Sequence, residues 1–101
     1  MTATLSVRHG SVYLSADVVK VYFATIDAVI VLIRDDVLMV MPVHQATAGG
    51  CLLKLRNAAG DRVASARDVF QDQGRLELVA ENLPARWISE KGALCASLPE
   101  K

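Results

Sequence analysis

The sequence predicts a β-rich α+β domain, built as a small barrel or an antiparallel sheet of about six to eight short strands with two short helices. Three observations predict this fold. The chain has short aliphatic and β-branched runs, polar or glycine-containing turns between them, and two segments with helical spacing of apolar residues. The chain has 101 residues, of which 52% are hydrophobic and 22% charged. That size and composition are typical of one globular domain, so we expect 1–101 to fold as a single unit.

The first elements are expected to be a hairpin and a helix. Leu5 and Val7 alternate with polar residues, and the pattern resumes after His9-Gly10, which predicts a small hairpin over residues 4–14. Ser15 is a typical helix N-cap. The following helix, 16–23, has one apolar face, made by Val18, Val19, Tyr22 and Phe23.

The strongest strand signal lies in the runs AVIVLI (28–33) and VLMVMPV (37–43). The short polar segment Arg34-Asp35-Asp36 between them predicts a hairpin. Pro42 cannot donate to a strand ladder, so we expect the second strand to end there or to lie at an edge. Both strands are apolar on both faces, whereas a sheet with one wet face alternates.

A second hairpin is expected in the middle of the chain, over the strand 51–56, the turn 57–60 and the return strand 61–64. Gly60 fits the left-handed position of such a turn. The adjacent Gly49-Gly50 raises the alternative of a phosphate-binding loop. We favour the hairpin, because the lysine and second glycine of a Walker-type loop are missing at the required spacing.

The C-terminal third is expected to hold a second helix and three strands. Ser65 with Asp68 predicts a capping box, followed by buried Val69 and Phe70 and a stop at Gly74. Strands are expected at 76–79, 86–89 and 93–98, the last two forming a hairpin with Trp87 packed across it.

The overall charge argues against some partners. Eleven basic residues balance eleven acidic ones, whereas nucleic-acid binding and membrane-surface binding usually need a basic excess. The N-terminus has no signal-peptide pattern, and the longest apolar run, 28–33, is too short to span a bilayer. We therefore expect a cytoplasmic protein that does not enter a membrane.

The reactive side chains do not assemble a recognisable motif. The soft metal ligands His9, His44, Cys51 and Cys95 show none of the usual paired spacings, so we expect no metal and no cofactor. Whether the two cysteines pair is left open. The one local nucleophile–base pair is Cys51 with His44, which makes a small enzyme an alternative function. The main prediction is that the protein is not an enzyme.

A basic strip makes DNA binding another alternative. The strip consists of Arg56, Arg62 and Arg67 with Lys54 beside them, and the residues expected to carry DNA binding are Arg8, Lys20, Arg56 and Arg62. Acidic Asp61 and Asp68 are interleaved with the basic residues of the middle segment, so cross-strand ion pairing is the simpler interpretation.

One segment has a familiar order of elements. The matching residues are Gly10, Val12 and Leu14 in a first strand, 16–23 in a helix, Ile26-Asp27 before the strand 28–33, and Asp35-Asp36 in the turn before 37–41. In this order, residues 10–42 resemble one half of an AbrB/MraZ-type swapped-hairpin barrel. The resemblance implies an intertwined dimer and a DNA-binding regulator. It departs from the family pattern at Ser11 and Ser15, where that pattern has arginine and proline.

The function we expect is binding to another macromolecule, because the strands 28–33 and 37–43 are apolar on both sides and exposed apolar surface marks interfaces. We expect a homodimer, with a further protein partner, as in an accessory or assembly subunit. The contact is made either by Val29, Val31, Leu38 and Val40 or by the opposite set, Ile30, Leu32, Met39 and Met41. The sequence leaves both sets open.

Overall fold

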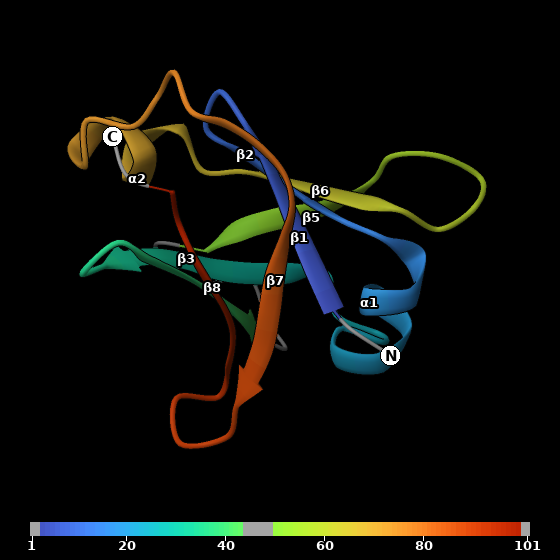
Figure 1. Ribbon diagram of the computed structural model, residues 1–101. Coiled ribbons are helices and arrows are strands. Elements are labelled where there is room, and N and C mark those ends of the chain that lie inside the picture. Colours follow the sequence, from blue (N-terminus) through green and yellow to red (C-terminus); the bar gives the residue numbers. More distant parts are fainter. Residues whose placement is uncertain (1–2, 44–49, 100–101) are drawn as a thin grey trace.

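The computed structural model describes residues 3–43 and 50–99. Within these ranges the chain forms eight strands and two helices (Figure 1). In chain order they are β1 (Ala3–Arg8), β2 (Ser11–Leu14), α1 (Ala16–Tyr22), β3 (Ala28–Arg34), β4 (Val37–Val43), β5 (Cys51–Leu55), β6 (Arg62–Ser65), α2 (Arg67–Asp72), β7 (Val79–Ile88) and β8 (Ala93–Ser97).

The strands close into one antiparallel barrel in the order β1-β2-β6-β5-β3-β4-β8-β7. The β-rich small barrel expected from the sequence is therefore confirmed. All of its strands come from one chain, so the ring closes without a strand from a second copy. Because the order is a ring, the β1–β2 hairpin lies across the barrel from the β3–β4 hairpin.

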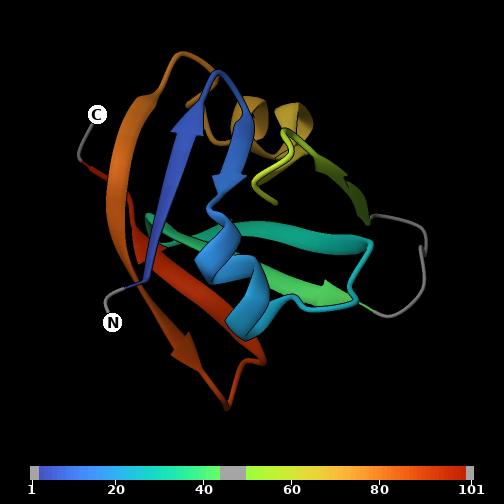
Figure 2. The same ribbon diagram turned by 90° about the vertical axis from the view of Figure 1, so that its right-hand side faces the viewer.

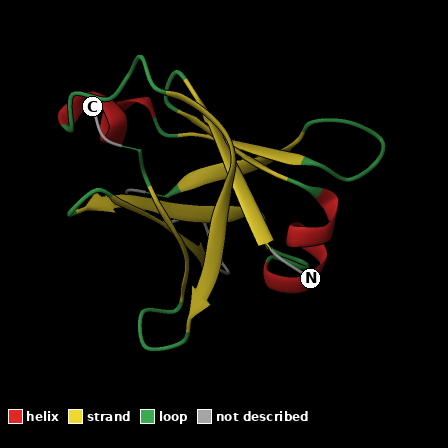
Figure 3. Ribbon diagram, viewed as in Figure 1, coloured by secondary structure: helices red, strands yellow, loops and turns green. Residues whose placement is uncertain are grey.

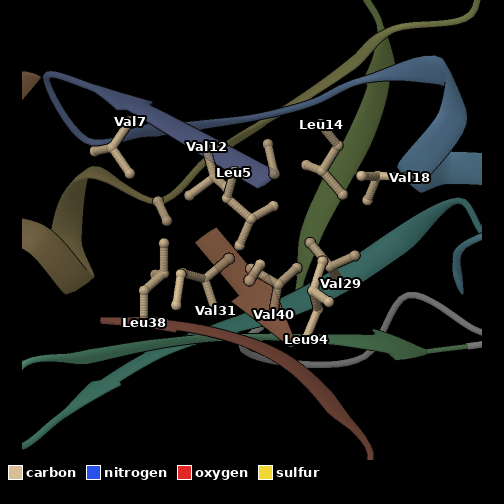
Figure 4. Packing of buried hydrophobic residues seen from close by; sticks show 14 of the residues in the cluster. Leu5, Val7, Val12, Leu14, Val18, Val29, Val31, Leu38, Val40 and Leu94 are labelled. Carbon is tan, nitrogen blue, oxygen red and sulfur yellow. The ribbon is translucent and has the colours of Figure 1, made fainter. Parts of the chain in front are cut away.

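The core fills the inside of the barrel. Side chains alternate between the two sides of a strand, and on the β1–β2 and β3–β4 walls the inward apolar residues are almost fully buried. Figure 4 shows these side chains converging from both hairpins. The innermost are Leu5, Val7, Val12, Leu14, Val29, Val31, Leu38, Val40 and Leu94, all 2% exposed or less.

The two helices lie at opposite ends of the barrel (Figures 2 and 3). Helix α1 begins at the predicted cap, where Ser15 Oγ accepts a hydrogen bond from the Val18 amide at 3.3 Å. Its apolar face is buried as expected, with Val18 and Phe23 in the core. Tyr22 extends the contact by stacking on Trp87, with the ring centroids 5.5 Å apart.

Helix α2 closes the other end with Phe70, which is fully buried. It lies directly against the β1–β2 turn, where the Ala66 amide donates to the Gly10 carbonyl at 2.8 Å. Gly10 has φ +85°, and a Cβ at this position would come within 2.9 Å of the Arg67 Cα. Glycine is therefore required here both by the turn and by the close approach of the helix.

The predicted hairpins at the two ends of the chain are confirmed, and so are the two central ones, 28–43 and 51–64. The 28–43 hairpin turns through Asp35 and Asp36, whose φ angles of +52° and +62° match the primed two-residue turn favoured between twisted strands. Pro42 pairs with Val29 in a part of β4 that extends beyond the last β8 partner, Val40, so it lies at an edge as expected.

The turn of the second hairpin follows the predicted pattern. Asn57 Oδ1 accepts from the amides of Ala59 and Asp61, and Gly60 has φ +100°. These are the contacts of an aspartate- or asparagine-led turn that closes on a left-handed glycine. Gly49 of the alternative phosphate loop lies outside the described residues.

The predicted cap of the second helix is wrong. Ser65 is the last residue of β6, paired with Ser11, and the helix begins after Ala66 without a side-chain cap. Ser65 continues the β-ladder instead of capping the helix, because its pairing with Ser11 extends the contact between β6 and β2. The buried positions Val69 and Phe70 nevertheless pack against the core as expected.

The strands expected at 76–79 and 86–89 are replaced by one longer strand, β7, which runs from Val79 to Ile88 through Pro84. Pro84 and the left-handed Asn82 (φ +54°) are typical strand breakers, yet the β1–β7 ladder absorbs them with a register shift between Leu5 and Val7. Trp87 faces Leu94 across the final hairpin, as predicted, and also reaches helix α1.

Candidate functional site

The β3–β4 hairpin separates its two apolar faces sharply. The inward set, Val29, Val31, Leu38 and Val40, is between 0 and 2% exposed. These residues belong to the core of the closed barrel, so they could line a contact with a partner only if the barrel opened.

The opposite set points out of the barrel. Ile30 is paired with Met41, and Leu32 with Met39, so the four side chains form one cluster on the outer side. Ile30, Leu32 and Met41 are half-buried, whereas Met39, between its neighbours, is only 7% exposed. The outward set is therefore the one that a partner could reach without opening the barrel.

Neighbouring strands extend this cluster. The register places Cys95 of β8 beside Met39, and Val37 lies two residues along β4 from Met39 on the same side. We call Ile30, Leu32, Val37, Met39, Met41 and Cys95 the apolar outer patch. On the β5 side it is bordered by Leu52, which is paired with Ala28 and is 58% exposed.

A shallow hollow of about 400 Å³ adjoins the patch over β4, β8 and β7. Val37, Ile88 and Cys95 contribute apolar walls, and Arg86 contributes a charged one. The outer surface here is therefore apolar and concave, with an arginine at its margin, which is a common composition for a protein contact.

The outer surface across the ring is polar. On β1 and β2 the outward residues are Thr4, Ser6, Arg8, Ser11 and Tyr13. All of these except Ser11 form the floor of a second hollow, of about 200 Å³, which we call the polar hollow. Its lining is completed by Leu14, Ser15, Arg56, Asp61, Glu81 and Asn82.

The candidate DNA-binding residues are only partly brought together. Arg8 and Arg56 both line the polar hollow, but Arg8 is paired with Glu81 and Arg56 lies 4.8 Å above the Tyr13 ring. Arg62 donates instead to the Leu53 carbonyl, and Lys20 lies in the last turn of α1; neither lines the hollow. The arrangement is a pair of arginines rather than a basic strip.

The cysteines have the properties of packed thiols. Both are free and half-buried, so the question of a disulfide between them is answered. Burial raises the pKa of the Cys51 thiol, and the nearby Asp68 carboxylate raises it further. Burial also raises the pKa of Cys95. A nucleophilic cysteine usually has a lowered pKa, and the other member of the suggested pair, His44, lies outside the described residues.

Metal and membrane features give two further findings for the described ranges, 3–43 and 50–99. No group of three or more histidine, cysteine, aspartate or glutamate side chains is placed to hold a metal ion there. No helix in the same ranges is long and apolar enough to cross a membrane.

Several surface residues could not be found from the sequence. Cys95 joins the apolar outer patch and Glu81 and Asn82 join the polar hollow because β8 and β7 pair with strands far away in the chain. Alternation within a strand shows which of its residues share a side. The sequence does not show which distant strands pair with each other.

Comparison with protein-family models, with curated proteins and with solved structures finds no match for this chain.

Proposed function

We propose that this protein is a non-enzymatic interaction module that self-associates through the apolar outer patch, as an accessory or assembly subunit does. The observation that carries the proposal is the chemistry of that patch on a barrel that is already closed. The interior is filled by the inward residues, so the outward Ile30, Leu32 and Met41 are not needed to complete the core.

The outward residues contrast with what water-facing strands contain. Outer positions of an antiparallel sheet in water are usually polar, and those of β1 and β2 follow this rule. On β3 and β4, from Ile30 to Leu32 and from Val37 to Met41, every outward residue is apolar. A contiguous apolar face of this kind indicates a contact surface.

A second copy of the chain is the occupant that fits best. The formal net charge is zero, and proteins near zero net charge associate without long-range repulsion. The patch is an extended sheet face, and two such faces pack with their strands nearly aligned, as in a sandwich. In a twofold dimer the same patch serves both partners, so it must only match itself.

The alternatives have less support. The enzyme hypothesis depends on Cys51, whose raised pKa makes it a weak nucleophile at neutral pH. The DNA-binding hypothesis depends on four basic residues that do not share one surface, since only Arg8 and Arg56 line the polar hollow.

The test is the mass of the protein in solution, by sedimentation velocity across the micromolar range. Wild type is expected to sediment as a dimer. Ile30→Lys is expected to sediment as a monomer, because the charge would have to be buried in the contact. Val63→Lys is the matched control: Val63 is also β-branched, half-buried and outward on its strand, but it lies on the polar side, paired with Tyr13. It is expected to remain dimeric.

Alkylation of the cysteines gives a second readout. Cys95 lies in the patch and Cys51 does not, so Cys95 is expected to react faster in Ile30→Lys than in wild type while Cys51 reacts equally in both. A monomeric wild type throughout the range, or equal dissociation by the two lysine variants, would contradict self-association through this face.

A further inference from the structure

The polar hollow lies on the wall opposite the apolar outer patch. Its floor is the outer side of β1 and β2, including Thr4, Ser6 and Tyr13. One wall is the β5–β6 turn with Arg56 and Asp61, and the other is the start of β7 with Glu81 and Asn82. Residues from four separated parts of the chain therefore meet at one concave surface.

Both carboxylates of the hollow are used by the protein itself. Asp61 Oδ1 accepts from the Ala16 amide at 2.7 Å, and Oδ2 accepts from the Asn57 side-chain amide at 2.9 Å. These two hydrogen bonds are the main reason that the pKa of Asp61 is lowered. Glu81 Oε1 accepts hydrogen bonds from both Nε and Nη2 of Arg8. Asp61 is thus held by neutral amide donors, with the Arg56 charge also acting on it, whereas Glu81 is held by the Arg8 guanidinium.

The guanidinium groups have donors to spare. A guanidinium carries five N–H donors in a planar fork, and Arg8 directs two of its nitrogens to Glu81. Arg56 is held over the Tyr13 ring at 4.8 Å, a cation–π contact that fixes the group without using its donors. No carboxylate among residues 3–43 and 50–99 lies within ion-pairing distance of Arg56.

We propose that the polar hollow binds a small organic anion, whose carboxylate or phosphate group accepts hydrogen bonds from Arg56 and Arg8. Guanidinium forks suit the paired oxygens of such groups. The hydroxyls of Thr4 and Tyr13 supply further polar contacts. The volume of about 200 Å³ is below the roughly 300–1,000 Å³ of drug-sized sites, which limits the ligand to a small molecule.

Titration calorimetry with inorganic phosphate and with malonate, in separate experiments at low salt, tests the proposal. At least one anion is expected to bind saturably in the millimolar range, and to bind more weakly as sodium chloride is added. Arg56→Gln is expected to weaken it about tenfold, the effect of losing one charge-assisted hydrogen bond. Arg34→Gln is the matched control, since Arg34 is an exposed arginine at the β3–β4 turn across the ring, and it is expected to leave the affinity unchanged.

Circular dichroism of both variants establishes that they are folded, which is expected because both arginines are exposed. Absence of saturable binding by either anion would overturn the proposal, and so would equal weakening by the two variants. A DNA duplex is titrated in parallel: binding of the duplex without binding of either small anion would also overturn it. Self-association is tested by variants of the apolar outer patch, on the opposite wall. Either proposal can therefore be contradicted without affecting the other.

Discussion

The two outer walls of this barrel have opposite chemistry although their inner sides are alike. The β1–β2 wall directs Leu5, Val7, Val12 and Leu14 inward, and the β3–β4 wall directs Val29, Val31, Leu38 and Val40 inward. On their outer sides the first wall is hydroxylated and charged, whereas the second is aliphatic.

This difference separates what folding requires from what it leaves free. Closing the ring and filling its interior constrain only every second residue of a strand. Once those positions are apolar, the outward positions can be polar or apolar with little effect on the core. An apolar outer wall is therefore better explained by contact with a partner than by the needs of the fold.

The largest expected effect tests whether the inward residues of both walls belong to the core alike. Leu5→Ala and Leu38→Ala each remove a fully buried side chain, and each is expected to lower the free energy of unfolding by about 2–5 kcal/mol. Chemical denaturation measures both, with outward Thr4→Ala as control, expected to change it by less than about 0.5 kcal/mol. A Leu38→Ala variant no less stable than Thr4→Ala would mean that β4 is assigned to the wrong side.

A smaller effect is expected where the β3–β4 turn is anchored. Arg75 is only 5% exposed and donates to the Pro99 carbonyl at 2.7 Å and to Asp36 at 2.9 Å. Arg75→Ala is expected to lower the free energy of unfolding by roughly 1–3 kcal/mol, the range for hydrogen bonds made by a charged group.

Two companion variants identify the cause of that loss. Arg75→Met keeps much of the aliphatic volume and is expected to recover part of the stability. Asp36→Asn is expected to cost less than Arg75→Ala, because the Asp36 side chain is 66% exposed and water screens the pair. If Asp36→Asn cost as much as Arg75→Ala in thermal unfolding, the ion pair rather than the Pro99 contact would be the anchor.

The smallest effect concerns the turn of the polar wall. The hydrogen bonds from Asn57 and from the Ala16 amide lower the pKa of Asp61 in the folded state. Its stabilising contribution is therefore complete above the ordinary aspartate pKa of about 3.9 and is lost as the pH falls through the lower folded value.

The stability difference between wild type and Asp61→Asn, followed by thermal unfolding from neutral pH downward, is accordingly expected to be constant above about pH 5 and to shrink below about pH 4. A difference that stays constant through that window would show that the charge of Asp61 does not stabilise the turn.

Local patterns were sufficient for most elements. Ser15 caps α1 because its hydroxyl needs only the amide of Val18, three residues away. The two central hairpins, 28–43 and 51–64, follow from their turns, Asp35-Asp36 and 57–60, since a tight turn pairs the strands beside it. The failures lie where distant pairing overrides a local signal: Ser65 continues β6 toward β2, and β7 runs through Asn82 and Pro84 because β1 and β8 hold it on both sides.

The candidate sites were predictable only in part. Alternation in 28–43 identified both sets of residues but not which set faces a partner, because either side of an isolated hairpin can be the inner one. Nothing local connects Arg8 with Arg56 or Met39 with Cys95, since strands far apart in the chain bring each pair together.

Composition and periodicity alone determined that the chain forms a small β-rich domain, with a helix capped by Ser15 and hairpins at 28–43 and 51–64. Those features depend on contacts between residues close in sequence. Tertiary structure decided the ring order, the inward side of each strand and the contents of both outer walls. These depend on which distant strands share hydrogen bonds, and burial of the apolar sides in one common interior selects that arrangement.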